Sequence, residues 1–161
     1  MNIFEYAMQM EKDGEGYYRW LVQQTTNKGM KAILTMLADE EVKHYNALKK
    51  IQSAEAHMAG TTILADAKNV FTQIKEEAEK SFDFDINQTD LYRKAQDIEE
   101  RSQDFYLEKA EEVEEEYQKA LFLRLAEEEE KHYFLLDNII EFTARPTYWL
   151  ENAEFYHLEE Y

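Results

Sequence analysis

Apolar residues recur at helical spacing in the first third of the sequence. Residues 3–26 place them on one stripe of a helix, and residues 30–54 do the same. Residues 27–29 are Asn-Lys-Gly, and they are predicted to form the turn because Asn and Gly tolerate the left-handed conformation that ends helices. Residues 3–54 are therefore expected to form an antiparallel helical hairpin.

The same pattern returns in the second half of the chain. A third helix is predicted over residues 90–114, capped by Thr89 or Asp90. A fourth is predicted over residues 117–144, and it ends before Pro146. The stretch between these two helices has neither Gly nor Pro, so its apolar pattern alone would also fit one continuous helix.

Two further segments complete the predicted organisation. Residues 55–88 contain a short amphipathic stretch, Ile63 to Lys80, and are predicted to be a long crossover between hairpins 3–54 and 89–145. Residues 146–161 form a short aromatic segment that caps the bundle or joins a partner. With one Pro and four Gly in 161 residues, the chain is expected to be a single all-α domain.

An internal repeat supports the division into two hairpins. Shifted by 88 positions, residues 1–53 show 14 identities with the second half of the chain, where roughly three or four are expected by chance. LADEEVKHY at residues 37–45 aligns with LAEEEEKHY at residues 125–133. A duplicated hairpin with a long connection predicts a four-helix bundle with one crossover, and it places the second turn at residues 114–116.

The repeat also relates four glutamates. Glu11 and Glu41 are equidistant from Thr26, at the first predicted turn, and Glu99 and Glu129 are equidistant from position 114, at the second. Residues equidistant from the turn of an antiparallel hairpin lie at the same height along the two helices. Each hairpin is therefore expected to place two carboxylates at one level.

A histidine follows one glutamate of each hairpin by three residues, a separation of about 60° and about one turn of rise, so each Glu–His pair can reach one point. Four carboxylates in a helical core would repel one another and lose their hydration, and two divalent cations would cancel their charge. Oxygen and imidazole ligands without thiolate suit iron, manganese or zinc. The candidate metal ligands are Glu11, Glu41, His44, Glu99, Glu129 and His132.

Other residues of the repeat have two interpretations each. Tyr18 and Tyr106 follow their helices' Glu by seven residues and either hydrogen-bond a ligand carboxylate or pack in the core. Glu40 and Glu128 precede the second Glu of each hairpin. They are expected on a solvated face, the alternative being a position beside the ligands or on the path by which ions enter.

Composition narrows the classes of function. The chain has no cysteine, which excludes disulfides, thiolate zinc sites and iron–sulfur clusters, so electrons would come from another protein. The net charge of −17 repels nucleic acid and anionic membranes and attracts cations. Without an apolar run of roughly 18 residues or a signal segment, a cytoplasmic protein is expected. The remaining histidines, His57 and His157, are expected at the surface.

Four motifs of the sequence resemble those of the rubrerythrin branch of the ferritin-like superfamily. They are MEKDGEGYY at residues 10–18, ADEEVKHY at residues 38–45, DIEERSQDFY at residues 97–106 and AEEEEKHY at residues 126–133. The resemblance covers nearly the whole chain. It implies a ferritin-like four-helix bundle with a di-iron carboxylate site and ferroxidase or peroxidase chemistry on oxygen or peroxide.

The resemblance also implies a role for each candidate ligand. The roles fall into three pairs related by the repeat: Glu11 and Glu99 as ligands from the first and third helices, Glu41 and Glu129 as bridging ligands, and His44 and His132 as terminal ligands.

The sequence departs from full rubrerythrins in two respects. These carry a further Glu three residues after the Glu of the third helix, and this position is Ser102 here, which makes the site more similar to the six-ligand arrangement of bacterioferritins. Full rubrerythrins also carry a four-cysteine rubredoxin domain that delivers electrons, and this chain has no cysteine. A self-contained peroxidase cycle is therefore not expected.

The function predicted from the sequence is that of a di-iron oxidoreductase acting on oxygen or hydrogen peroxide. It would contain two metal ions, iron in the first place with manganese or zinc as alternatives, and use an external electron-donor protein. A homo-oligomer is expected, with a dimer favoured. Two other functions remain open: an iron-binding or sequestration protein without turnover, and a metal-free helical interaction module.

Overall fold

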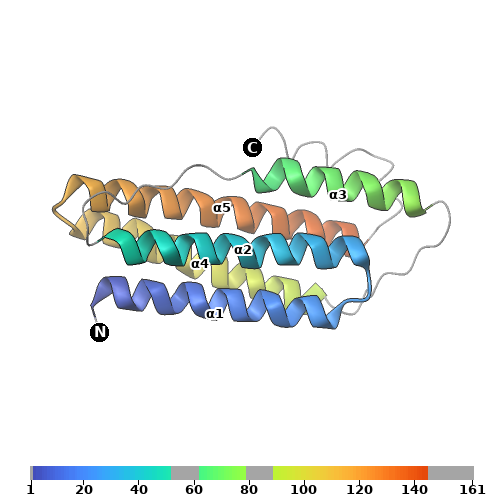
Figure 1. The fold of residues 1–161 in the computed structure, drawn as a ribbon, viewed down its shortest axis with the longest axis horizontal. Helices are drawn as coiled ribbons and strands as arrows, with labels where there is room; N and C mark the ends of the chain where they lie inside the picture. Colours follow the sequence, from blue (N-terminus) through green and yellow to red (C-terminus); the bar gives the residue numbers. More distant parts are fainter. Residues whose placement is uncertain (1, 52–61, 79–88, 145–161) are drawn as a thin grey trace.

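The computed structural model describes residues 2–51, 62–78 and 89–144, with side chains as far as Val70 in the middle range. These residues form five helices and no strand, which confirms the all-α prediction (Figure 1). The helices are α1 (Ile3–Gln24), α2 (Lys28–Lys50), α3 (Ile63–Ala78), α4 (Thr89–Glu112) and α5 (Glu116–Ala144).

Four of the helices form a bundle of two antiparallel hairpins. The most extensive contacts between elements are those of α1 with α2 and of α4 with α5. The remaining helix, α3, lies outside the bundle and packs along α2 and α5 (Figure 1). In the sequence it lies between the two hairpins. This is the predicted bundle with one crossover and its own short helix.

The first turn differs in detail from its prediction. Residues 25–27 connect the helices, and Lys28 and Gly29 belong to α2. The reason is the side chain of Asn27, which accepts a hydrogen bond of 2.9 Å from the backbone N–H of Met30 and so acts as the N-cap of α2. Asn27 therefore begins a helix here, whereas the prediction used it to end one.

The second turn lies one residue before the position, residues 114–116, at which the repeat placed it. Residues 113–115 interrupt the helical pattern, although they contain neither Gly nor Pro. The two turns are thus centred on Thr26 and Glu114, the positions from which the four glutamates were counted. The helix α4 begins at Thr89, within one residue of its predicted start.

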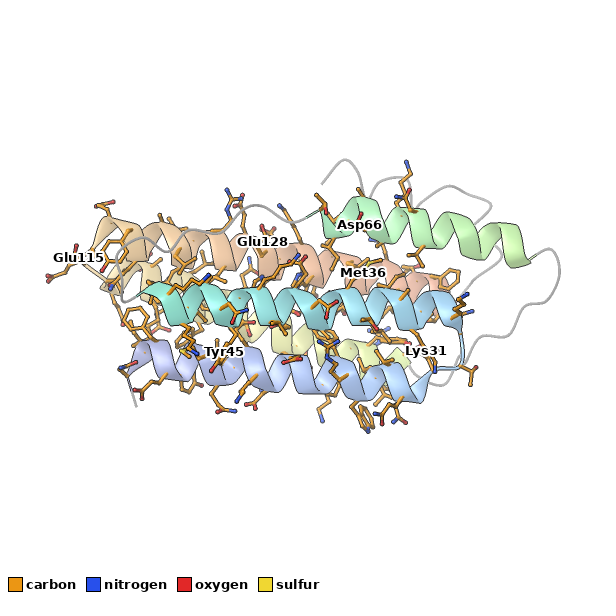
Figure 2. All side chains as sticks on the ribbon, in the orientation of Figure 1. Lys31, Met36, Tyr45, Asp66, Glu115 and Glu128 are labelled. Carbon is orange, nitrogen blue, oxygen red and sulfur yellow. The ribbon has the colours of Figure 1, made fainter. Side chains whose placement is uncertain are left out.

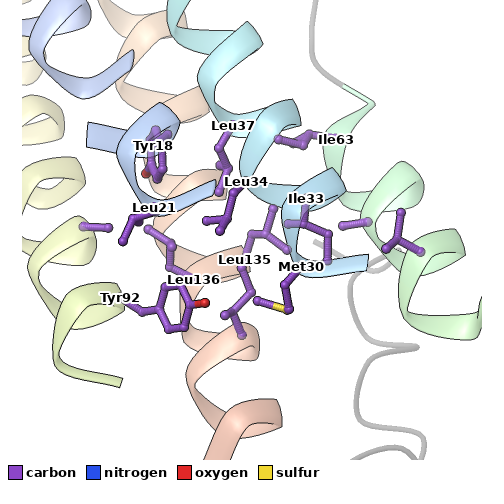
Figure 3. Close-up of a cluster of buried hydrophobic side chains, with 14 of the residues drawn as sticks. Tyr18, Leu21, Met30, Ile33, Leu34, Leu37, Ile63, Tyr92, Leu135 and Leu136 are labelled. Carbon is purple, nitrogen blue, oxygen red and sulfur yellow. The ribbon is translucent and has the colours of Figure 1, made fainter. Parts of the chain in front are cut away.

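The core consists of two apolar clusters at different heights along the bundle. One joins all five helices and includes Tyr18, Leu37 and Leu135, with α3 contributing Ile63 (Figure 3). The other lies near the second turn and includes Phe122. Each fully buried aliphatic or aromatic side chain contributes about 1.5–3 kcal/mol of hydrophobic stabilisation. Together the clusters hold the four bundle helices in register on both sides of a central level.

None of the described helices has the length and apolar character needed to cross a membrane. The predicted aromatic segment at residues 146–161 and the histidines at positions 57 and 157 lie outside the described residues.

Candidate metal centre

The six candidate ligands lie between the two apolar clusters. Along α1, for example, Ala7 belongs to one cluster and Tyr18 to the other, and Glu11 lies between them. None of the six exposes more than 3% of its surface. They come from four helices: Glu11 from α1, Glu41 and His44 from α2, Glu99 from α4, and Glu129 and His132 from α5.

The six side chains form two overlapping groups of four. Within each group, one carboxylate oxygen or imidazole nitrogen of every member lies within 4.8 Å of those of the other members. Both groups contain Glu41 and Glu129, one carboxylate from each hairpin. This arrangement offers two neighbouring cation positions with two carboxylates in common. The groups are Glu11, Glu41, His44 and Glu129, and Glu41, Glu99, Glu129 and His132.

Each imidazole turns its Nδ1 atom toward these carboxylates. Nδ1 of His44 is 2.8 Å from Oε1 of Glu129 and 3.3 Å from Oε2 of Glu11. Nδ1 of His132 is 3.3 Å from Oε1 of Glu41 and 3.4 Å from Oε1 of Glu99. The two rings stack with their centroids 5.4 Å apart and their planes 7° from parallel. The histidines are thus held face to face with the same nitrogen directed at the acidic groups.

Two tyrosines hold carboxylates of the opposite hairpin. The hydroxyl of Tyr18 donates a hydrogen bond to Oε1 of Glu99, and the hydroxyl of Tyr106 donates one to Oε1 of Glu11. Burial, followed by the charge of these carboxylates, raises the pKa of both hydroxyls well above its usual value, so both remain protonated donors. Both rings are also part of the apolar clusters, so both interpretations of Tyr18 and Tyr106 apply at once.

Two glutamates of the centre keep their protons to a higher pH than ordinary carboxyl groups do, which reduces the charge of the centre. Burial raises the pKa of Glu41 and Glu129 well above the usual range, and the charge of Glu11 raises it further. These are the two carboxylates that both groups contain. In the metal-free protein they therefore bind protons where a metal-loaded protein would bind cations.

The other two glutamates stay ionised. Burial alone would raise their pKa, but the charge of a neighbouring imidazole and the hydrogen bonds to each carboxylate together outweigh it. With His132 as the largest opposing cause, the pKa of Glu99 falls to about 2, and with His44 in the same role the pKa of Glu11 is lowered. Burial alone would lower the pKa of His44, and the charge of Glu11 raises it instead. Each hairpin thus contributes one glutamate that keeps its charge and one that gives it up.

Whether these residues fit a metal can be judged from the buried polar atoms at the centre that have no hydrogen bond. Buried side-chain atoms without a hydrogen-bond partner among the described residues cost roughly 1–3 kcal/mol each, and such atoms are concentrated here. All of them are of the types that bind iron, manganese or zinc, so the residues fit a pair of such ions. The atoms without a hydrogen bond are Oε2 of Glu11, Oε1 of Glu41, Oε2 of Glu99, Oε1 of Glu129 and both ring nitrogens of His44 and His132. The Nδ1 atoms are among them although they lie 2.8–3.3 Å from three of these oxygens, because those contacts do not meet the geometry of a hydrogen bond.

Comparison with known families agrees with this geometry. A family model described as Rubrerythrin matches residues 2–140, which is most of the chain. The chain belongs to the rubrerythrin family. Its resemblance to the ferritin-like di-iron superfamily is thereby confirmed, and a di-iron carboxylate protein is the type of protein that the family supports.

A solved structure shares the fold of this rubrerythrin-family protein. It is the hypothetical protein Pfu-1136390-001 from Pyrococcus furiosus, with a TM-score of 0.63 and 23% sequence identity over 88% of this chain and 87% of that one. This similarity shows the fold alone. None of the curated proteins matches the sequence significantly.

Two small residues lie at repeat-related positions beside the centre. Ser102, where full rubrerythrins carry a further Glu, is buried, and Gly14 is its counterpart in α1. A Cβ atom at Gly14 would lie 3.0 Å from Oε2 of Glu41. No sequence pattern predicted this close approach, although the repeat aligns Gly14 with another small residue, Ser102.

The prediction that Glu40 and Glu128 face solvent is wrong. Glu40 is 8% exposed and Glu128 is 1% exposed. Glu40 supplies a carboxylate oxygen within 4.8 Å of a nitrogen of both His44 and His132. Both glutamates lie on the side of their helices that carries the histidine four residues later, and this position buries them.

Proposed function

We propose that this rubrerythrin-family protein is a di-iron carboxylate oxidoreductase that acts on oxygen or hydrogen peroxide. The proposed ligands are Glu11, Glu41, His44, Glu99, Glu129 and His132. One observation carries the proposal: six buried side chains from four helices, four carboxylates and two imidazoles, meet at one level of the bundle. Most of their oxygen and nitrogen atoms have no hydrogen-bond partner among the described residues. Membership of the rubrerythrin family supports iron as the metal.

The residues divide the work of holding two cations. In this proposal Glu41 and Glu129 would bridge the two cations, which their presence in both groups supports, and Glu11 and Glu99 would hold one cation each. Iron bound at both positions would supply the electrons and the Lewis acidity for reducing oxygen or peroxide. The protons that Glu41 and Glu129 hold in the metal-free protein leave when cations bind, since a metal-binding carboxylate must be deprotonated.

The surrounding residues keep the site in place. Tyr18 and Tyr106 each fix one oxygen of a ligand carboxylate from the opposite hairpin. The apolar clusters on both sides limit the access of water to the centre. This chain has no cysteine to hold a rubredoxin-type iron, so we propose that it receives electrons from another protein. We also propose a homo-oligomer, with a dimer favoured.

The test measures metal content and two reactions on the same preparations. Protein purified without chelator is analysed for metals, then loaded anaerobically with ferrous iron and followed for peroxide consumption and for ferrous oxidation by oxygen. We expect two iron ions per chain and at least one of the reactions. Glu129→Ala should abolish both binding and reaction. Glu130→Ala, which removes an exposed acid beside it, should change neither.

Each other result has a definite meaning. Less than one metal ion per chain, with wild-type ligands, would overturn the metal centre and favour a helical interaction module. Two bound iron ions without either reaction would overturn the enzymatic part of the proposal and favour an iron-binding or sequestration protein.

A further inference from the structure

Two buried glutamates adjoin the centre but have no place in the proposed ligand set. Glu40 and Glu128 each precede a proposed bridging ligand by one residue and a histidine by four. Figure 2 shows Glu128 on α5, near the middle of the bundle. Burying a carboxylate costs several kcal/mol, and an ion pair with a single lysine offsets that cost only when further hydrogen bonds also satisfy the carboxylate oxygens. The burial of both repeat-related residues therefore indicates a role in the interior.

The histidines provide the first half of that role. Their Nδ1 atoms are turned toward the ligand carboxylates, so Nε2 lies at the other edge of each ring. Nε2 of His44 and of His132 is buried and has no hydrogen-bond partner among the described residues. An imidazole that binds a metal through Nδ1 carries its proton on Nε2, which then needs an acceptor.

The glutamates provide the second half. Glu40 has a carboxylate oxygen within 4.8 Å of a nitrogen of each histidine, and with Nδ1 already directed at the ligands, Nε2 is the nitrogen left for it. Both carboxylate oxygens of Glu128 are buried without a hydrogen-bond partner among the described residues. Nζ of Lys43 lies 3.4 Å from Oε1 of Glu40 and Nζ of Lys131 lies 3.6 Å from Oε1 of Glu128, so each carboxylate has a lysine beside it.

We propose that Glu40 and Glu128 are positioning residues for the two histidines. Their carboxylates accept the Nε2–H groups of the stacked pair when metal is bound, and so fix both rings in the tautomer that presents Nδ1 to the metal. Partners of this kind orient metal-binding histidines, and their removal typically costs about 10–100-fold in metal affinity. The inference rests on the proposed metal centre and adds a pair of acceptors behind it.

The experiment uses the full chain loaded with zinc, a diamagnetic metal that the same ligands accept. Zinc affinity is measured by competition with a chelator dye, and the imidazole N–H protons are observed by NMR on protein labelled with ¹⁵N-histidine. Wild-type protein should show slowly exchanging Nε2–H signals from both His44 and His132. Glu40→Ala and Glu128→Ala should each lose at least one signal and bind zinc about 10–100-fold more weakly.

Conservative variants separate orientation from charge. Glu40→Gln and Glu128→Gln remove the charge but keep an acceptor oxygen, so they should keep the N–H signals and recover much of the lost affinity. Glu130→Ala removes an exposed acid from α5, the helix that contains Glu128, and should behave as wild type. Circular dichroism on every variant checks that the helices are intact, and the near-isosteric Gln variants keep the test decisive should an Ala variant fail to fold.

Three results would overturn the inference. If the Ala variants keep both N–H signals and the zinc affinity of Glu130→Ala, the two glutamates do not position the histidines. If Gln and Ala variants lose affinity equally while both signals persist, their effect is one of charge alone. If wild-type protein fails to bind zinc or iron, the proposed centre fails, and this inference fails with it.

Discussion

The hydroxyl of Tyr106 in α4 donates a hydrogen bond of 2.5 Å to Oε1 of Glu11 in α1, 95 residues earlier in the chain. Its repeat counterpart runs in the opposite direction, from Tyr18 in α1 to Glu99 in α4. These two bonds join the hairpins directly at the level of the candidate ligands. Each tyrosine thus couples the packing of the apolar clusters to the position of a carboxylate, because its ring lies in a cluster and its hydroxyl reaches the centre.

Replacing Tyr106 by Phe should affect both stability and metal binding. The substitution leaves a buried, ionised carboxylate of Glu11 without its donor, at a cost of about 1–3 kcal/mol in the free energy of unfolding of the metal-free protein. It also frees that carboxylate to rotate, so zinc or ferrous affinity should fall about 10-fold or more. Urea unfolding and a metal titration measure the two effects.

Tyr17→Phe is the matched control. The hydroxyl of Tyr17 also links α1 to α4, through a hydrogen bond of 2.7 Å to the backbone carbonyl of Leu91, but it does not contact the centre. This variant should lose about 0.5–1.5 kcal/mol of stability and keep its metal affinity. Equal metal affinities of the two Phe variants would show that Tyr106 has only a packing role.

Glu129→Ala should separate folding from metal binding. Burial and the charge of Glu11 raise the pKa of Glu129, so its carboxyl group is held in the core at a cost to the metal-free fold. Its removal should abolish the binding of two metal ions and leave the helical content of the metal-free protein unchanged. Metal analysis and circular dichroism test both points, and loss of the helical signal would contradict the expectation.

Much of this centre could be predicted because a repeat constrains it. The offset of 88 residues located, to within one residue, the turn at residues 113–115, which no Gly or Pro marks. The equal distances of the glutamates from the two turns predicted a common level. Helical periodicity and chain symmetry are properties of the sequence itself. They needed no knowledge of how the hairpins pack.

What could not be predicted depends on contacts between helices. The burial of Glu40 and Glu128 and the close approach of Gly14 to Glu41 are fixed by how far apart and at what rotation α1, α2 and α5 pack. A sequence pattern gives the direction of the buried face of a helix only to within tens of degrees. An acidic residue at the edge of that face is therefore predicted to face solvent, because most acidic residues do. The prediction that Asn27 ends a helix was wrong for a local reason, because Asn is common both at the start and at the end of helices.

The stability of the metal-free protein should fall as pH rises. Glu41 and Glu129 have a raised pKa in the folded state, so above the ordinary carboxyl range, near 4.5, the folded chain is penalised for losing their protons. His44 has a raised pKa too, and the stability that it contributes below its ordinary pKa of 6.5 is lost as pH rises further. The lowered pKa of Glu99, about 2, adds stability above 4.5 that is lost only in stronger acid.

Thermal unfolding in the presence of a chelator measures this dependence. The midpoint should be highest near about pH 5 and decline toward pH 8. The double variant Glu41→Gln, Glu129→Gln should decline less steeply, because the remaining slope then comes from His44 and the surface acids. A midpoint that rises between pH 5 and 8 in the wild-type protein would contradict the assignment of protons to the two glutamates.

Two glycines of α1 differ in the space that their surroundings leave for a side chain. A Cβ atom at Gly14 would lie 3.0 Å from Oε2 of Glu41 and 3.4 Å from its Cδ atom, whereas one at Gly16 would meet nothing within 4 Å. Both positions are helical, so alanine gains up to about 1 kcal/mol over glycine at either in backbone terms. Gly16→Ala should realise that gain in urea unfolding and leave metal affinity unchanged.

Gly14→Ala should show the cost of the missing space. The atom that its methyl group meets is the end of the Glu41 side chain, which can move. The helix should therefore form, but the carboxylate, which belongs to both groups of ligands, must shift by a few tenths of an ångström. We expect a smaller gain in stability than for Gly16→Ala and a loss of zinc and ferrous affinity of about 10-fold or more. Because both variants add one methyl group to the same helix, equal metal affinities would show that Glu41 does not need its present position to bind metal.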